Sequence, residues 1–224
     1  MRHGGALNFE ANSSENKDMP SKQNSYSKPD FWSQKAFKEG YPARSVYKLQ
    51  EMDAKFSFLK KNLKALDLGS APGSWTTWLL RNLQGGGKVV SVDLNPLAKN
   101  VTGANLVFLQ GDLLSAEIRA QVKEHGPFDL VVCDAAPLTT GNRTVDTARS
   151  KSLVEMAIWY AQDMLRAGGN FCVKIFQNGD QQNFLRQMRE IFSTAKGFKP
   201  QACRQESFET YLVGLYKKEK TESE

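Results

Sequence analysis

The sequence predicts an α/β fold: a mostly parallel sheet of seven strands with one antiparallel edge strand and helices on both faces. From residue 64 onward, short apolar runs alternate with segments of helical periodicity, which is the pattern of strands joined by crossover helices. The runs are apolar enough for strands that are covered on both faces. Only a short turn separates the last two runs, so we expect antiparallel pairing at one edge.

Length and composition limit the chain to one sizeable domain, since it has 224 residues and 40% hydrophobic content. We expect this domain at 28–217, preceded by a disordered polar tail at 1–27 and followed by a charged tail at 218–224. Met19 is an alternative start of the natural chain. No apolar run reaches the roughly 18 residues of a membrane helix, and no signal-peptide core is present, so we expect a cytoplasmic protein.

Two short helices are expected ahead of the sheet, at 30–39 and 45–57. They flank a break at Gly40, and Ser45 is a candidate N-cap for the second helix. The predicted strands are 64–69, 88–94, 105–110, 128–134, 170–176, 198–204 and 208–216. The predicted helices between them are 72–83, 114–124, 147–166 and 180–193.

Glycines and cysteines add two expectations. The stretch Ala167-Gly168-Gly169 is predicted to end the longest helix. The three cysteines are widely spaced, each inside an apolar run, and the chain has only two histidines. We therefore expect buried thiols and no metal site.

A strand runs into a glycine-bearing turn and a helix at Leu66–Trp75, with the sequence Leu-Asp-Leu-Gly-Ser-Ala-Pro-Gly-Ser-Trp. Pro72 suits the first turn of a helix, and Gly69 and Gly73 would let the backbone approach a ligand closely. The pattern G-x-G-x-x-G of dinucleotide sites is absent, which favours a nucleoside without phosphates. The alternative is an ordinary turn between a strand and a helix.

Polar residues at the ends of predicted strands are the next candidates, because ligands of parallel sheets bind there. Asp93 closes a strand twenty residues after Gly73, where a carboxylate can accept both hydroxyls of a ribose. Asp112 follows the next strand and could meet an adenine edge. The alternative for both is a loop carboxylate that caps the following helix.

Three charged residues interrupt or end apolar runs in the C-terminal half of the chain. Asp134 ends the run Val-Val-Cys-Asp, and Lys174 stands inside Phe-Cys-Val-Lys-Ile-Phe. Because an uncompensated buried charge is costly, Lys174 needs an acidic partner from a neighbouring strand end. Glu209 is a similar interruption, although an exposed edge position would also explain it.

The positive charge of the chain gathers ahead of the glycine-bearing turn. Residues 1–64 hold twelve Lys and Arg against seven Asp and Glu. In the segment 28–61, basic residues alternate with aromatic ones, a mixture suited to phosphates and unstacked bases. The basic residues are Lys28, Lys35, Lys38, Arg44, Lys48, Lys55, Lys60 and Lys61. The alternative is a solvated basic face whose aromatic side chains pack on the core.

With these residues identified, the chain resembles the FtsJ/RrmJ family of S-adenosylmethionine-dependent ribosomal RNA 2′-O-methyltransferases over about residues 30–217. The resemblance rests on Arg44-Ser45-x-Tyr47-Lys48-Leu49, Asp67-Leu68-Gly69-x-Ala71-Pro72-Gly73-x-Trp75, Asp93-Leu94, Gln110-Gly111-Asp112, Asp134-x-x-Pro137, Val173-Lys174-x-Phe176-Gln177 and Glu209-x-Tyr211. The departures are Ser74 in place of a glycine, Ala135-Ala136 after Asp134, and a longer polar N-terminus.

The resemblance implies a Rossmann-like methyltransferase fold, S-adenosyl-L-methionine as cofactor and a catalytic tetrad. The tetrad falls on Lys48, Asp134, Lys174 and Glu209, with Lys174 as the candidate base and the four groups titrating as a coupled set. The implied cofactor residues are Asp67, Gly69, Ala71, Pro72, Gly73, Trp75, Asp93, Asp112 and Asp134. No metal is implied, because the leaving group departs neutral.

The implied substrate is a uridine of large-subunit (23S) ribosomal RNA in the assembled or nearly assembled large ribosomal subunit, modified by a monomeric enzyme. The alternatives are a 2′-O-methyltransferase for transfer RNA or messenger RNA caps, and a non-catalytic RNA-binding protein of ribosome assembly. The latter would not need all four tetrad residues. A nicotinamide dehydrogenase would leave the basic segment and Lys174 without a role.

Overall fold

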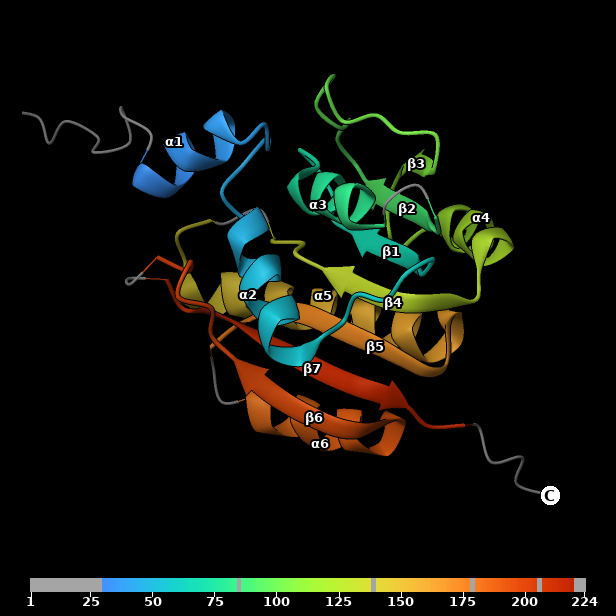
Figure 1. Cartoon of the computed structure of the whole chain (residues 1–224). Coiled ribbons are helices and arrows are strands. Elements are labelled where there is room, and N and C mark those ends of the chain that lie inside the picture. Colours follow the sequence, from blue (N-terminus) through green and yellow to red (C-terminus); the bar gives the residue numbers. More distant parts are fainter. Residues whose placement is uncertain (1–29, 84–85, 138–139, 178–179, 205–206, 220–224) are drawn as a thin grey trace, which may run out of the picture.

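The computed structural model describes residues 30–83, 86–137, 140–177, 180–204 and 207–219 (Figure 1). The predicted disordered tail at 1–27, with Met19, lies outside the described residues. Of the predicted tail at 218–224, Lys218 donates its backbone N–H to Ile191 O at 2.9 Å, and 220–224 lie outside the described residues.

A seven-stranded sheet forms the centre of the molecule, in the order β3-β2-β1-β4-β5-β7-β6. The strands are β1 (Lys64–Leu68), β2 (Lys88–Asp93), β3 (Leu106–Gln110), β4 (Phe128–Cys133), β5 (Leu165–Phe176), β6 (Phe192–Phe198) and β7 (Glu209–Lys217). Strands β1 to β5 pair in parallel, and β7 runs antiparallel to both β5 and β6. The predicted fold class, a mostly parallel sheet with antiparallel pairing at one edge, is confirmed.

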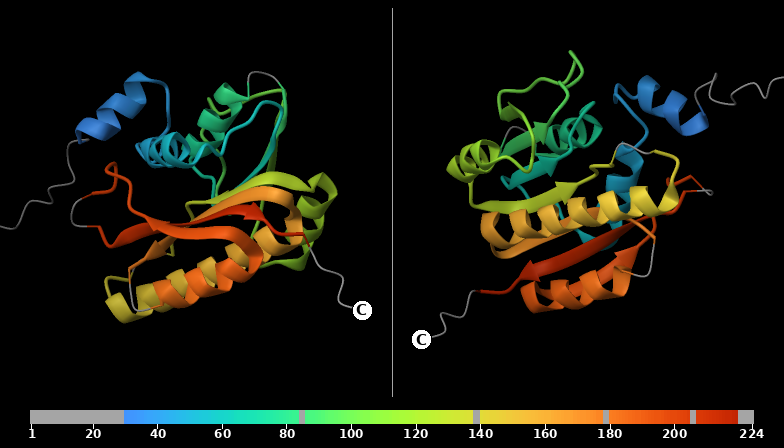
Figure 2. Two further views of the ribbon diagram at one scale, coloured as in Figure 1. Left: turned by 60° about the horizontal axis from the view of Figure 1, so that its bottom comes forward. Right: turned by 180° about the vertical axis from the view of Figure 1, so that it is seen from behind.

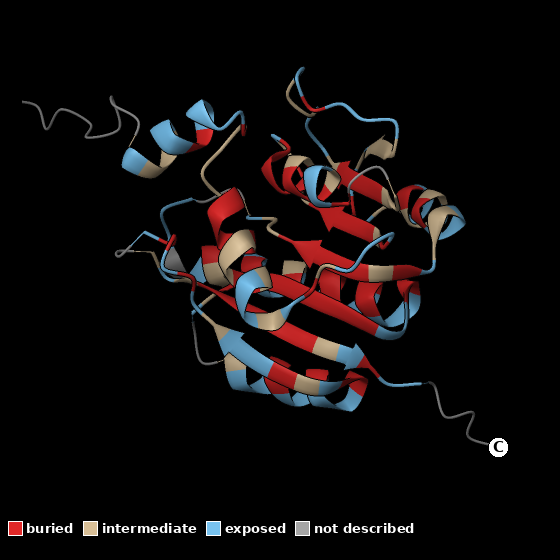
Figure 3. Cartoon of the chain, in the orientation of Figure 1, coloured by how far each residue is buried: buried red, intermediate tan, exposed pale blue. Residues whose placement is uncertain are grey.

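Helices cover both faces of this sheet (Figures 1 and 2). They are α1 (Phe31–Lys38), α2 (Val46–Phe56), α3 (Ser74–Asn82), α4 (Ala116–His125), α5 (Arg143–Met164) and α6 (Gln181–Ile191). Helices α4, α5 and α6 share one apolar core with the sheet, and α1, α2 and α3 share the other. Figure 3 shows the buried residues concentrated in the strands and on the helix sides that face them. The three cysteines are buried free thiols, as predicted.

The sixth strand is displaced from its predicted position. The sequence pattern predicts it at 198–204, whereas β6 spans Phe192–Phe198 and begins directly where α6 ends. A helix that leads into a strand without a loop leaves no turn signal in the sequence. The ring of Phe192 packs where a side chain at Gly214 of β7 would stand, 2.5 Å from that Cβ position, so the glycine permits the pairing.

The end of the longest helix also differs from the prediction. Helix α5 ends at Met164, and Ala167-Gly168-Gly169 lies in the irregular start of β5. Strand β5 pairs Leu165 with Phe128 and Asn170 with Leu130, so extra residues bulge out between these two pairs. Gly168 has a φ of +75° there, a conformation that glycine adopts at little cost.

Candidate active site

The strand order places a topological switch point between β1 and β4. The chain proceeds outward from β1 to β2 and β3, then returns to β4 on the other side of β1. Ligands of open α/β sheets bind at such a point, beyond the carboxyl ends of the strands. Gly69 lies so close to the loop after β4 that a Cβ on it would stand 2.5 Å from Ala135 Cβ.

A cavity of about 520 Å³ lies at the carboxyl ends of β1, β2, β3 and β4. Its size suits a small ligand such as a nucleoside. It is lined by Gly69, Ala71, Asp93, Leu94, Asn95, Gly111, Asp112, Leu113, Leu114, Asp134, Ala135, Ala136 and Leu153. Three of these residues carry carboxylates, so the cavity suits a ligand with cationic or hydrogen-bond donating groups.

Asp93 is held at the end of β2 by backbone donors. Its Oδ2 accepts a hydrogen bond from Ala71 N at 2.9 Å, and its Oδ1 accepts one from Asn95 N at 2.8 Å. The bond from Ala71 N ties the turn after β1 to the end of β2. A carboxylate has about four acceptor sites, so Asp93 can still accept hydrogen bonds from the hydroxyls of a ribose.

Asp112 also lines the cavity, at the turn after β3. Its Oδ1 accepts a hydrogen bond from Leu114 N at 2.9 Å. The following helix, α4, is capped by Ser115, whose side chain accepts from Ile118 N. The alternative interpretation of Asp112 as the cap of that helix is therefore wrong.

Four predicted cofactor residues, Asp67, Pro72, Gly73 and Trp75, are not among those that line the cavity. Pro72 precedes α3 and was expected inside it, but the helix begins after Gly73. Gly73 has a φ of +108°, and a Cβ on it would stand 2.8 Å from Val101 Cγ2. The glycine is thus required by backbone conformation and by packing inside the protein, and the expected approach to a ligand does not explain it.

Asp67 is fully buried below the turn. Its Oδ2 accepts a hydrogen bond from Thr76 Oγ1 at 2.7 Å, and Thr76 Oγ1 lies 2.8 Å from Ser91 Oγ. Its Oδ1 has no hydrogen-bond partner among the described residues. Burial, which outweighs the Thr76 hydrogen bond, raises the pKa of Asp67 to about 7.

Trp75 joins α3 to the start of α2. Its side chain is buried, and its Nε1 donates a hydrogen bond to Ser45 O at 2.8 Å. Ser45 occupies the predicted N-cap position, although its side chain makes no capping hydrogen bond. Trp75 therefore helps to position the helix that carries Lys48.

The four predicted tetrad residues come together from four separate parts of the chain. Lys48 Nζ on α2 lies 2.7 Å from Glu209 Oε1 at the start of β7. Lys174 Nζ on β5 lies 3.1 Å from Asp134 Oδ1 and donates a hydrogen bond to Asp134 O at 2.5 Å. Both lysines are only 8% exposed. The partner predicted for Lys174 is therefore Asp134, and Glu209 is paired instead of exposed at an edge.

The charges of the two pairs influence each other. Burial alone would raise the pKa of Asp134, but the ammonium groups of Lys174 and Lys48 hold it below its ordinary value. Burial alone would lower the pKa of Lys48, but the carboxylates of Asp134 and Glu209 raise it above its ordinary value. Lys48 and Asp134 are therefore charged at neutral pH.

Tyr211 is a further member of this cluster that the sequence prediction did not assign to the site. Its hydroxyl donates a hydrogen bond to Asp134 Oδ1 at 2.7 Å. Burial and the nearby carboxylates raise the pKa of Tyr211 well above its ordinary value, so it stays a neutral donor. The signal was its position two residues after Glu209, because alternate residues of a strand face the same side.

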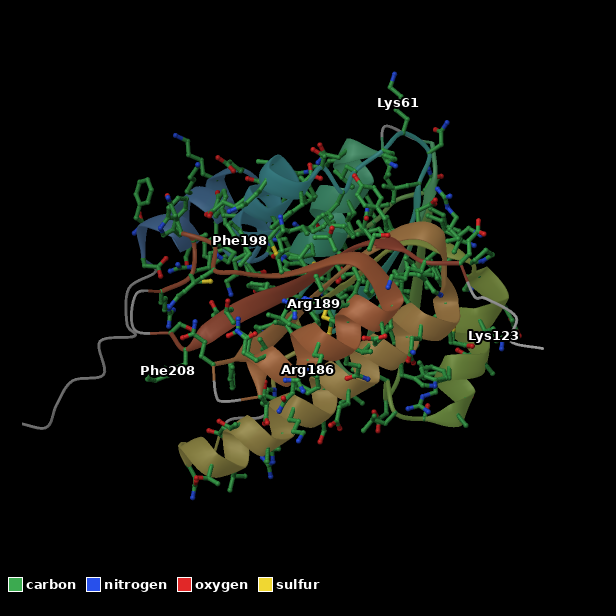
Figure 4. All side chains as sticks on the ribbon, turned by 90° about the horizontal axis from the view of Figure 1, so that it is seen from below. Lys61, Lys123, Arg186, Arg189, Phe198 and Phe208 are labelled. Atoms are coloured by element: carbon green, nitrogen blue, oxygen red, sulfur yellow. The ribbon has the colours of Figure 1, made fainter. Side chains whose placement is uncertain are left out.

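The basic segment predicted at 28–61 divides between two ends of the molecule. Lys35 and Lys38 are exposed on α1. Lys60 and Lys61 precede β1, at the amino edge of the sheet, and Figure 4 shows Lys61 far from Phe208, the residue before Glu209. Lys28 lies outside the described residues. Two of the aromatic residues, Tyr41 and Tyr47, are buried, as the alternative interpretation expected.

Comparison with known proteins identifies the family. The FtsJ-like methyltransferase family matches residues 41–217. The chain belongs to this family. It is 60% identical over 193 residues to ribosomal RNA large subunit methyltransferase E of Treponema denticola, covering 86% of this chain and 97% of that protein. The protein of the same name from Treponema pallidum (strain Nichols) is 43% identical over 193 residues, covering 86% and 96%.

A solved structure agrees with the family assignment. A protein of Plasmodium falciparum described as a ribosomal RNA methyltransferase superposes with a TM-score of 0.70 at 27% identity, covering 79% of this chain and 98% of that one. The predicted resemblance is confirmed, and the chain is a methyltransferase.

Neither a metal site nor a membrane-spanning helix is found among the described residues. No group of three or more His, Cys, Asp and Glu side chains is arranged to hold a metal ion in the part of the chain that the structure describes. Among the described helices, none combines the length and the apolar character needed to cross a membrane.

Proposed function

We propose that this protein transfers a methyl group from S-adenosylmethionine to the 2′-hydroxyl of a uridine in large-subunit ribosomal RNA, in the cytoplasm and on an assembled or nearly assembled subunit. One observation carries the proposal: Asp134 lines the cavity and is also the ion-pair partner of Lys174. The ligand cavity and the paired charges therefore share a residue. The names of the two bacterial relatives support ribosomal RNA as the substrate.

The residues of the cavity fit this cofactor. Asp93 has acceptor sites left for ribose hydroxyls, and Asp112 can accept from an adenine amino group. Asp134 supplies negative charge toward the paired lysines and toward a cationic ligand. When bound, S-adenosylmethionine supplies a methyl group on a positively charged sulfur.

The paired charges fit the removal of a proton from a hydroxyl. Lys174, once its ammonium has released a proton to solvent, accepts the proton of the ribose hydroxyl. The oxygen then forms a bond to the methyl carbon while the bond from carbon to sulfur breaks, and the electron pair remains on sulfur. Lys48 keeps its charge beside Glu209 and stabilises the negative charge that develops on the oxygen.

Mapping of ribose methylation tests the proposal. Large-subunit RNA from cells that lack the protein should have lost one 2′-O-methyluridine, and expression of the parent protein should restore it. Expression of a Lys174→Ala variant should not. An unchanged ribose methylation map of large-subunit RNA, together with a lost methyl group in transfer RNA or a messenger RNA cap, would favour the alternative substrates.

A further inference from the structure

The turn at residues 200–203, between β6 and β7, is fastened to α2 by side chains outside the tetrad. Glu51 of α2 accepts two backbone hydrogen bonds from this turn, from Gln201 N to Oε2 at 2.6 Å and from Ala202 N to Oε1 at 2.8 Å. Arg44, just before the same helix, donates from Nη2 to Ala202 O at 2.6 Å. We call these three bonds the α2 clamp.

The α2 clamp joins the helix that carries Lys48 to the turn that precedes Glu209 in the chain. Glu51 stands three residues after Lys48, so the two side chains leave neighbouring positions on one side of α2. The clamped turn leads through residues 204–208 to Glu209. Lys48 and Glu209 are 2.7 Å apart at Nζ and Oε1, so the clamp lies next to this ion pair along both parts of the chain.

Cys203 lies near Glu209. It is the last residue of the clamped turn and is only 6% exposed, and burial together with the nearby Glu209 carboxylate raises the pKa of its thiol. A shift of the turn would therefore move a neighbour of the carboxylate as well as the chain that leads to it.

The clamp also reaches α1, which carries the exposed lysines Lys35 and Lys38. Arg44 forms an ion pair with Asp30, and Asp30 caps α1 by accepting from Ser33 N at 2.8 Å. The Arg44 guanidinium thus contacts both the cap of α1 and the 200–203 turn, and Arg204, directly after the turn, also forms an ion pair with Asp30. A bidentate or forked guanidinium contact of this kind fixes geometry as well as charge.

We infer that Glu51 and Arg44 are positioning residues, which hold the Lys48–Glu209 pair in its reactive geometry by fastening α2 to the 200–203 turn. This inference rests on the proposed function, because it concerns the same methyl transfer. Neither residue lines the cavity, so their effect passes through the ion pair. Because displacement of reacting groups by about 1 Å can cost 100-fold in rate, a loosened clamp should reduce turnover without altering cofactor affinity.

The test compares Glu51→Gln with a matched control, Asp53→Asn. Asp53 lies on the same helix and its carboxylate also accepts a backbone hydrogen bond, but from Leu59 N at 2.8 Å, in the loop at the other end of the helix. Glu51→Gln should lower kcat for RNA methylation by about 10- to 100-fold and leave the Kd for S-adenosylmethionine unchanged. Asp53→Asn should keep the parent kcat.

A second readout needs no catalysis. A thiol reagent applied to the folded protein, with mass-spectrometric identification, should label Cys203 faster in Glu51→Gln than in the parent or in Asp53→Asn. Cys133 and Cys172 are buried in the sheet and should stay protected in all three proteins, which controls for global unfolding. Unchanged labelling of Cys203 would overturn the clamp, and faster labelling with the parent kcat would overturn its role in positioning.

A double variant tests the route of the effect. If Glu51 acts through the ion pair, adding Glu51→Gln to Glu209→Gln should cause little further loss of rate, whereas independent effects would multiply. Multiplied losses would overturn the inference. A parent protein that methylates no RNA would overturn the proposed function instead, and the labelling of Cys203 would then decide the clamp by itself.

Discussion

The carboxylates that lie at the site edge of the sheet have different partners in its two halves. In the half formed by β1, β2 and β3, Asp93 and Asp112 accept hydrogen bonds from backbone N–H groups. In the half formed by β4, β5 and β7, Asp134 and Glu209 pair with the buried lysines Lys174 and Lys48.

The two arrangements suit two different tasks along one edge of the sheet, binding of a ligand and transfer of a proton. Backbone donors leave acceptor sites of Asp93 and Asp112 open toward the cavity, which suits recognition of hydroxyls and amino groups. Paired ammonium groups suit the second half for moving a proton and for stabilising an oxyanion. Binding and chemistry should therefore respond separately to substitution.

The largest effect is expected from Lys174→Ala. It removes the proposed proton acceptor, so the rate of methyl transfer should fall by about 10²- to 10⁴-fold. The affinity for S-adenosylmethionine, measured by calorimetry, should stay that of the parent. A Lys174→Ala variant that turns over at nearly the parent rate would mean that the paired lysines of the second half of the sheet do not carry out the proton transfer.

The next effect concerns stability and the buried Asp67. Its pKa is about 7 in the folded protein and close to 3.9 in an unfolded chain. Between about pH 4 and pH 7, the folded chain therefore keeps a proton on Asp67 that the unfolded chain has released. Because of this difference, the free energy of unfolding falls as the pH rises through this range, by about 4 kcal/mol in all.

Asp67→Asn has no such titration. The free energy of unfolding of this variant, measured by urea at pH 5 and pH 8, should exceed that of the parent by more at pH 8 than at pH 5. Asp53→Asn is the control on a half-buried carboxylate. An equal difference at both pH values would contradict the interpretation.

A smaller effect is expected from Asp93→Ala. Loss of charge-assisted hydrogen bonds to a ribose should weaken binding of S-adenosylmethionine by about 1.5 to 3 kcal/mol. Because the lysines are untouched, kcat at saturating cofactor should remain near that of the parent. Calorimetry that finds the parent affinity would mean that the first half of the sheet does not hold the ribose.

The smallest effect is expected from the exposed lysines of α1. The double variant Lys35→Ala/Lys38→Ala should weaken binding to large subunits and flatten its salt dependence, by up to about 0.7 to 0.9 in log–log slope for each phosphate that the protein no longer neutralises. Lys60→Ala/Lys61→Ala removes the same charge at the amino edge of the sheet and should bind like the parent. If both double variants behave alike, charge near the site carries no special role.

The fold could be predicted from the sequence because its signals are local. Alternation of apolar runs and helical patterns predicted every strand of β1 to β4 to within a residue at each end. The prediction was wrong at β6 and at the start of β5, where a helix passes into a strand with no loop between them. There, the deciding contacts are made with β7 and β4, and these have no local signature.

The site was predictable to a similar extent. Each tetrad residue occupied a motif position in the sequence, and the structure brings all four together. Gly73 was assigned to ligand approach because its neighbour Val101 could not be seen in the sequence. Glu51 could not be assigned at all, since its partners Gln201 and Ala202 lie about 150 residues away in the chain.

Identification of the methylated atom tests the transfer to a 2′-hydroxyl most sharply. Large subunits from cells that lack the protein would be incubated with the purified protein and S-adenosylmethionine carrying an isotopically labelled methyl group, and the RNA would be digested to nucleosides. We expect label in 2′-O-methyluridine alone with the parent protein, and none with Lys174→Ala. Label on a base, or equal labelling by Lys174→Ala, would contradict the proposed transfer.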